Sequence, residues 1–306
     1  MTEAAPARVS LAAMPIPNFF EADRAEIEAA LFTLLPPESE PPPVIHRSMR
    51  YSVFAGGKRI RPILCLEAAR VFSDPPRGVL PVACALEFIH TYSLIHDDLP
   101  ALDNDDLRRG RPTNHKQFGE AIAILAGDAL LTRAFEVIAR AELPAERRAA
   151  LVREIATAAG TVNGMVGGQV ADLEAGGRPI DPAMLEYIHR SKTAALICAS
   201  VVSGAIAGGA ENVDVERLRR FGQSIGLAFQ VVDDILDVEE SSATLGKTAG
   251  KDASQKKATY PALYGLEKSR ETARALLERA HAELVPLAAR AQRLRELADF
   301  LVARRA

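Results

Sequence analysis

The chain has 306 residues, of which 48% are hydrophobic, and its 37 Lys and Arg against 40 Asp and Glu leave a net charge of −3. This apolar content is enough for one large domain or two ordinary ones, and the near-neutral balance without a basic, aromatic patch argues against a nucleic-acid-binding protein. Three cysteines in apolar contexts indicate reduced core thiols, and no secretory signal or membrane span is evident, so we expect a cytoplasmic protein.

The chain reads as a tail followed by a series of helices. Residues 1–17 contain several Pro and Ala residues without a regular pattern and are predicted to be a disordered tail. Residues 18–306 are predicted to form a single all-α domain, because no alternating strand, short repeat or composition break interrupts the helical stretches. The first helix is expected over 19–35 and should end at the prolines of 36–43.

A predicted glycine turn is followed by a group of cations: Gly56 and Gly57 precede Lys58 and Arg61. Glycines let backbone N–H groups approach an anion, and the two cations supply charge-assisted donors, so one interpretation is a grip on phosphate. The other is an ordinary turn followed by a charged helix start.

The next stretch places five aspartates within residues 97–106, at the end of an apolar helix predicted over 79–96. Carboxylates this close raise one another's pKa values unless a cation lies among them, and Mg²⁺ commonly bridges carboxylates to phosphates. A solvated acidic loop is the alternative. Pro100 is expected to break the helix, so that Asp103 returns towards Asp97.

Two further groups of charged residues have two interpretations each. Arg108 and Arg109 either neutralise the neighbouring aspartates or clamp a phosphate bidentately. Lys192, next to Thr193, enters an apolar helix, where a lysine either extends to solvent or meets an anion. Between them, the glycines of 160–177 are too many for an ordinary helix unless two helices or a ligand approach closely there.

A second acidic cluster, Asp233, Asp234 and Asp237, lies in another apolar stretch, and its first and last members share one helix face. Two such clusters predict carboxylates that face each other across a shared cavity. The lysine-rich stretch over 244–257 is either a solvated linker or a lid over phosphates. Together these features predict a magnesium site for the diphosphate of a hydrophobic molecule, whose carbon–oxygen bond is ionised away from water.

Several motifs carry a resemblance to a known family: 56–62 (Gly-Gly-Lys-Arg-Ile-Arg-Pro), 94–110 (the first aspartate-rich motif), 167–169 (Gly-Gly-Gln), 192–193 (Lys-Thr) and 230–237 (the second). Together they resemble the trans-polyprenyl diphosphate synthases, most nearly the bacterial farnesyl diphosphate synthases. The resemblance implies an isoprenoid-synthase-type bundle of many helices around a central cavity, and a homodimer. It also implies head-to-tail condensation of isopentenyl diphosphate with dimethylallyl or geranyl diphosphate to farnesyl diphosphate, by Mg²⁺-assisted ionisation, condensation and elimination.

The resemblance also implies residue roles. Three Mg²⁺ per active site would be bound by Asp97, Asp98, Asp103, Asp233, Asp234 and Asp237. The allylic diphosphate would be contacted by Arg108, Lys192 and Lys247, and isopentenyl diphosphate by Lys58, Arg61, His90 and Arg109. Oxygen atoms of Lys192, Thr193 and Gln230 would face the allylic cation, and the released diphosphate would take the final proton.

Product length is expected to depend on Tyr92, five residues before the first aspartate, and on the adjacent Ser93. In the family that the sequence resembles, the residue at this position closes the bottom of the tunnel that holds the growing prenyl chain. The resemblance implies that an aromatic ring there limits the product to C15. A geranylgeranyl diphosphate synthase, with a longer product, is the main alternative. A class I terpene cyclase is a less favoured alternative, because it would not need the isopentenyl diphosphate site that residues 56–62 imply. A non-catalytic helical partner subunit is also less favoured, because such a protein could lose its aspartates and this chain has both clusters.

Overall fold

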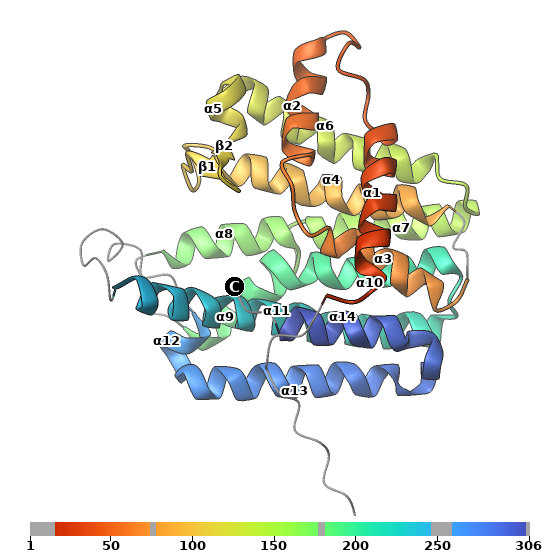
Figure 1. Ribbon diagram of the computed structural model, residues 1–306, viewed down its shortest axis with the longest axis vertical. Coiled ribbons are helices and arrows are strands. Elements are labelled where there is room, and N and C mark those ends of the chain that lie inside the picture. Colours follow the sequence, from red (N-terminus) through yellow and green to blue (C-terminus); the bar gives the residue numbers. More distant parts are fainter. Residues whose placement is uncertain (1–15, 74–77, 177–180, 246–258, 304–306) are drawn as a thin grey trace, which may run out of the picture. The chain divides into compact units, whose positions relative to one another are not determined.

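The structure, a computed structural model, describes residues 16–73, 78–176, 181–245 and 259–303. Regular structure in these ranges is almost wholly helical, which confirms the all-α prediction (Figure 1). Nearly all of the predicted tail and most of the lysine-rich stretch, including Lys247, lie outside the described residues.

Contacts within the chain divide it into two compact units. The unit that we call the first comprises residues 18–159 and 199–216, and the second comprises the described residues within 160–198 and 217–306. The expectation of a single domain stays a prediction.

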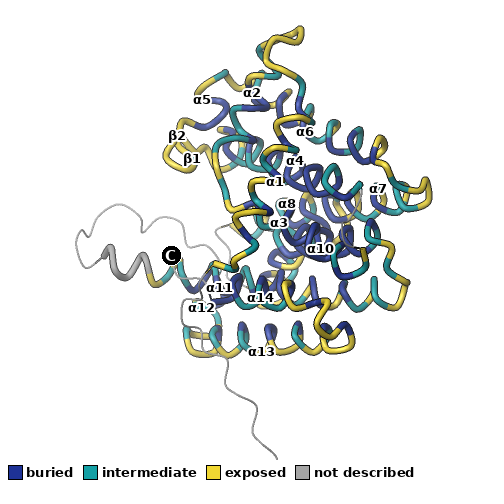
Figure 2. The backbone as a smooth tube through the Cα atoms, turned by 45° about the vertical axis from the view of Figure 1, so that its right-hand side comes forward, coloured by how far each residue is buried: buried dark blue, intermediate teal, exposed yellow. Residues whose placement is uncertain are grey.

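The first unit is built around one apolar helix, α4. Its helices are α1 (Phe20–Leu34), α2 (Pro43–Val53), α3 (Ile60–Arg70), α4 (Val79–Asp97), α5 (Asn114–Phe118), α6 (Glu120–Ala139) and α7 (Ala145–Ala159). α4 packs chiefly against α3 and α6. Its residues 82–89 are all buried, because they are apolar on nearly every side (Figure 2). α4 therefore holds the aspartates at its end on a rigid core element.

A short hairpin follows the aspartates. Strand β1 (Leu107–Arg108) pairs antiparallel with β2 (Arg111–Pro112) through the two-residue turn Arg109-Gly110. Both turn residues have positive φ, +53° and +73°, as a type I′ hairpin requires. Two-residue strands are too short for alternation to be visible in a sequence, which is why no strand was predicted here.

The second unit contains α8 (Met165–Ala175), α9 (Pro182–Ile188), η1 (His189–Ala194), α12 (Tyr260–Tyr264), α13 (Leu266–Leu284), η2 (Val285–Ala291) and α14 (Gln292–Val302). Two helices, α10 (Ala195–Gly208) and α11 (Asn212–Leu245), run across the division. The element η1 is a π-helix continuous with α9 and α10, and it packs against α8. A Cβ on Gly168 of α8 would collide with the backbone of Lys192, so the predicted close approach of two helices is present.

Two helices are long and apolar enough to span a membrane by composition, Val79–Asp97 and Pro182–Gly208. Their most apolar windows are 67% and 72% buried inside the structure. Core helices meet the same criterion, so their length and composition lend only weak support to a span.

Candidate active site

The first aspartate cluster is arranged by the end of α4. Asp97 is the last residue of the helix and Asp98 caps it. Beyond Pro100 the chain turns back, so that the Asp103 amide donates a hydrogen bond to the Asp97 carbonyl oxygen at 2.9 Å. The predicted return of Asp103 is therefore present, and its exposed side chain belongs to the same end of the helix.

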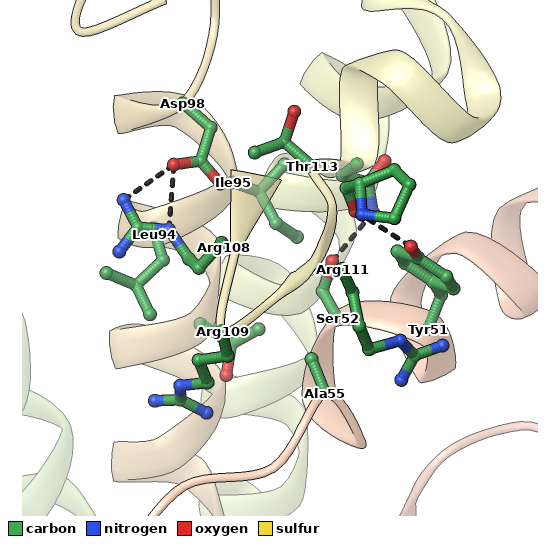
Figure 3. A pocket seen from close by; sticks show the side chains of 13 residues that line it. Tyr51, Ser52, Ala55, Leu94, Ile95, Asp98, Arg108, Arg109, Arg111 and Thr113 are labelled. Atoms are coloured by element: carbon green, nitrogen blue, oxygen red, sulfur yellow. Dashed lines mark hydrogen bonds and ion pairs between the residues drawn. The ribbon is translucent and has the colours of Figure 1, made fainter. Parts of the chain in front are cut away.

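Asp98 is held by the hairpin (Figure 3). Its Oδ1 accepts a hydrogen bond from Arg108 Nε at 2.7 Å and lies 2.6 Å from Arg108 Nη2, while the carboxylate is only 5% exposed. Burial raises the pKa of Asp98, and the Arg108 guanidinium opposes that shift. Arg108 is thus paired with an aspartate here, as the neutralising interpretation predicted.

A second group of basic residues surrounds His90, which lies about two helical turns before Asp98 on α4. Burial, followed by repulsion from Arg61 and Arg109, holds the pKa of His90 well below its usual value, so the imidazole is neutral near pH 7. Burial also lowers the pKa of Arg61 to about 10, with repulsion from Arg109 acting in the same direction. Nearby Lys58 is exposed on the preceding loop.

The Arg61 side chain has an unmet hydrogen-bonding atom. Within the described residues, its Nε is buried without a partner. The Arg109 guanidinium donates to the carbonyl of Gly56, which joins the hairpin turn to the glycine loop. Buried donors and mutually repelling cations are stabilised by an anion, so this group fits a diphosphate held without metal.

A small cavity of about 30 Å³ lies beside these residues in the first unit. Its walls include Asp98, Arg108 and Arg109 on one side, and Tyr51 and Thr113 on the other (Figure 3). This volume holds a water molecule or two rather than a prenyl chain.

Tyr92, the expected chain-length residue, lies on α4 with 7% of its surface exposed. Burial, with the charge of Asp97 as the second cause, raises its pKa to about 12. Its ring meets that of His96 edge to face at 5.8 Å between centroids. The adjacent Ser93 hydroxyl donates to the His90 carbonyl, along its own helix.

The second aspartate cluster is organised by buried Asp234 on α11. Its carboxylate accepts hydrogen bonds from His189 Nε2 at 2.8 Å, the Tyr260 amide at 2.9 Å and Gln230 Nε2 at 3.1 Å. Asp233 is half-buried and Asp237 is exposed. Asp234 thus binds the π-helix to the segment that begins α12, while Gln230, expected at the allylic cation, is bonded to it.

Sequence reasoning missed His189 and Tyr260, whose rings stack at 5.4 Å. The available signal was a histidine three residues before Lys192, at the polar start of a helix that is apolar from Ala194 on. Its partner is 45 residues away, a distance over which no local pattern operates.

Lys192 and Thr193 lie within the π-helix η1. A π-turn replaces the regular i,i+4 bonding and is frequent at functional sites. Lys192 Nζ donates to Asp172 Oδ2 of α8 at 2.7 Å. Next to Asp172, on the same helix, the buried Oε1 of Gln169 has no hydrogen-bond partner in the described part of the chain.

The magnesium fit rests on the first cluster. Among the described residues, no group of three or more His, Cys, Asp and Glu side chains gathers tightly enough to hold a metal by itself. Mg²⁺ needs only one or two protein carboxylates when substrate phosphates and water complete its shell. Adjacent Asp97 and Asp98, with Asp103 returned beside them, are oxygen donors of that kind. That the two clusters face each other stays a prediction.

Comparison with known proteins shows the family of the chain. A family model for polyprenyl synthetases matches residues 42–292. The chain is 49% identical over 292 residues to the dimethylallyltranstransferase of Fischerella ambigua, covering 94% of this chain and 84% of the relative. It is 54% identical over 267 residues to the chloroplastic geranylgeranyl pyrophosphate synthase of Capsicum annuum, covering 86% and 72%.

The farnesyl diphosphate synthase of Geobacillus stearothermophilus is 48% identical over 264 residues, covering 85% of this chain and 88% of the relative. A crystal structure of an FPP/GFPP synthase from Zymomonas mobilis, in its apo form, superposes with a TM-score of 0.81 at 37% identity, covering 93% of this chain and 97% of that one. The chain therefore belongs to the polyprenyl synthetase family. It is a prenyltransferase, of a family that uses Mg²⁺ and condenses isopentenyl with allylic diphosphates.

Proposed function

We propose that this prenyltransferase makes farnesyl diphosphate from isopentenyl diphosphate and the allylic starters dimethylallyl and geranyl diphosphate. The observation that supports the proposal is that two groups of charged side chains, different in kind, lie along the C-terminal half of α4 and its end. One is a carboxylate cluster suited to metal-bound diphosphate, and the other is the cationic group around the unpartnered Nε of Arg61. A terpene cyclase, which takes one diphosphate, has no use for the second.

The allylic diphosphate is assigned to the aspartate clusters. The metal ligands proposed are Asp97, Asp98, Asp103, Asp233, Asp234 and Asp237, for three Mg²⁺. When bound, Mg²⁺ neutralises the diphosphate and makes it a better leaving group. Arg108 and Lys192 contribute positive charge to that group by exchanging their present carboxylate partners for phosphate oxygens. Lys247 has the same proposed role.

The isopentenyl diphosphate is assigned to Lys58, Arg61, His90 and Arg109. Neutral His90 donates one ring N–H, and Arg61 offers its unpartnered Nε. Backbone and side-chain oxygens of Lys192, Thr193 and Gln230 are assigned to face the allylic cation and to stabilise it at close range. The released diphosphate accepts the proton that leaves in the final elimination, so no protein base is required.

Product length is proposed to be C15, on account of the buried ring of Tyr92 and of Ser93 beside it. A C20 product is the second candidate, because relatives named as geranylgeranyl pyrophosphate synthases match as well as the farnesyl diphosphate synthase does.

The test is incubation of the purified protein with isopentenyl diphosphate, dimethylallyl or geranyl diphosphate, and Mg²⁺, followed by chromatographic sizing of the dephosphorylated products. A C15 alcohol as the main product supports the proposal. A main C20 alcohol supports the second candidate, and hydrocarbon products or an absence of turnover would refute both.

A homodimer in the cytoplasm is proposed as the working state of the enzyme. The residues described here belong to one chain, so the proposal rests on the family resemblance. Light scattering coupled to size-exclusion chromatography tests it, and a mass near 32.9 kDa, that of one chain, would refute the dimer.

A further inference from the structure

The loop between α2 and α3, which carries Lys58, is held in place by the hydrogen bonds of one buried arginine. Arg59 is 3% exposed, and its guanidinium makes three hydrogen bonds. Its Nε donates to Glu28 Oε1 at 2.7 Å, Nη1 to Glu87 Oε1 at 2.7 Å and Nη2 to the Val53 carbonyl at 2.6 Å. Helices α1, α4 and α2 thus each supply one acceptor.

The backbone of Arg59 is also unusual. It adopts a left-handed conformation, with φ +53° and ψ +36°, at the residue that precedes α3. A residue with a side chain is disfavoured there, so the conformation persists only where the surroundings impose it. Since Lys58 precedes this residue and Arg61 follows by two, its conformation sets where both cations lie.

Glu87 is the buried carboxylate beneath this group. It is 3% exposed and lies on α4, three residues before His90, so the two side chains share a helix face. Besides its bond to Arg59, its charge attracts Arg61 and Arg109. By contrast, the Glu28 side chain is 36% exposed, and its interaction with Arg59 is partly screened by water.

We propose that Glu87, acting through Arg59, is a positioning residue that preorganises the metal-free diphosphate site formed by Lys58, Arg61, His90 and Arg109. The inference rests on the proposed function of that site. Glu87 holds Arg59 in its left-handed conformation and counterbalances cations that would otherwise repel one another before substrate arrives. The pair therefore lowers the free energy needed to assemble the site.

The experiment compares Glu87→Gln with the matched variant Glu28→Gln, which alters the exposed partner of the same guanidinium. KM is measured for isopentenyl diphosphate at saturating geranyl diphosphate and Mg²⁺, and then for geranyl diphosphate at saturating isopentenyl diphosphate. Because Glu87→Gln removes the charge from a buried hydrogen bond that holds Arg59, and with it the loop between Lys58 and Arg61, we expect the first KM to rise by about tenfold or more. The second KM and kcat should stay within about threefold, and Glu28→Gln should change all three by less than about threefold.

Because removal of one member of a buried ion pair can unfold a protein, Arg59→Met/Glu87→Met serves as a second variant. It removes both buried charges and keeps similar volume, and it should raise the same KM. Calorimetric titration with inorganic pyrophosphate in the presence of a chelator gives a readout without turnover, and the Kd should rise in parallel.

Equal increases in both KM values, or an unchanged KM for isopentenyl diphosphate in the folded double variant, would overturn the proposal. Arg61→Ala separates this failure from failure of the proposed function. If wild type condenses the two substrates and Arg61→Ala raises the KM for isopentenyl diphosphate while Glu87→Gln does not, only the positioning role of Glu87 is wrong. If Arg61→Ala has no such effect, the assignment of the site itself is wrong.

Discussion

Two cations assigned to the allylic diphosphate each have a carboxylate partner in the structure. Arg108 pairs with Asp98, and Lys192 pairs with Asp172 at 2.7 Å. Such pairs hold long side chains in place and satisfy their charge in a partly buried site. In the proposed function, phosphate oxygens replace these carboxylates as partners of the two cations. Each cation is therefore already held in place by a carboxylate before that exchange.

Tyr92→Ala should lengthen the product beyond C15, because loss of the ring would leave room for further isoprene units at the base of the tunnel that the family resemblance implies. Chromatography or mass spectrometry of the dephosphorylated products measures the effect. Tyr92→Phe, which keeps the ring, should still give C15. An unchanged product length in Tyr92→Ala would remove this residue from the chain-length role.

The lowered pKa of His90 gives a pH-dependent prediction. Burial and neighbouring arginines keep the imidazole neutral, and a bound diphosphate would attract a proton and raise its pKa. Binding of isopentenyl diphosphate should therefore take up protons near pH 6, and less at pH 8. Calorimetry in buffers of different ionisation enthalpy measures the uptake. The difference between wild type and His90→Gln isolates the contribution of His90, and equal uptake in both would contradict the assignment.

At the scale of elements, helices meet through buried polar contacts as well as apolar ones. Glu67 of α3 lies beside Asp23 of α1, and both are nearly inaccessible to solvent. Arg70 of α3 bonds to each of them. Burial, with the Asp23 carboxylate as the further cause, raises the pKa of Glu67 to about 7. The protonation state of Glu67 therefore affects the electrostatics of the contact between α1 and α3.

A carboxyl group whose pKa is raised in the folded state stabilises the fold most at low pH, and its contribution is lost as pH rises through the folded value. The free energy of unfolding should thus fall between about pH 5 and pH 8 in wild type. Glu67→Gln, which stays neutral, should reduce that fall by about 2 kcal/mol. Urea denaturation at both pH values measures it.

The control is Glu26→Gln, since Glu26 also approaches Arg70, at 3.4 Å, but its side chain is 46% exposed. It should leave the pH dependence nearly as in wild type. A pH dependence of Glu67→Gln equal to that of wild type would mean that Glu67 does not titrate in this range.

For the whole molecule, the central expectation is that the two aspartate clusters act on one ligand although they belong to different compact units. Asp97→Ala and Asp233→Ala should each lower kcat by about three orders of magnitude, because groups that act as a unit lose most of their effect when one is removed. For the same reason the double variant should be little worse than either single variant.

Steady-state turnover of geranyl diphosphate with isopentenyl diphosphate across Mg²⁺ concentrations measures this double-mutant cycle. Losses that add fully in the double variant would indicate separate roles. Near wild-type activity in either single variant would contradict a shared site.

Much of this protein was already determined by its sequence. The apolar helix over 79–96 and the turn at Pro100 follow from local patterns, and the structure contains both, with Asp103 bonded back to Asp97. The close approach at the glycine-rich segment was also foreseeable, because few other reasons place glycines in a helix. Such features depend on residues within a few turns of one another, which is the range over which periodicity and turn chemistry operate.

Only the tertiary structure decided how buried charges are partnered. Asp234 bonds to His189 and the Tyr260 amide, and Arg59 bonds to Glu28 and Glu87, across 26 to 45 residues of chain. Similarly, the π-helix at Lys192 has no signature in the pattern of apolar residues. The reason is physical. A buried charge must be paired because its desolvation is costly, and its partner is whichever group the packing of helices distant in sequence brings near it. Local sequence patterns therefore cannot predict the partner.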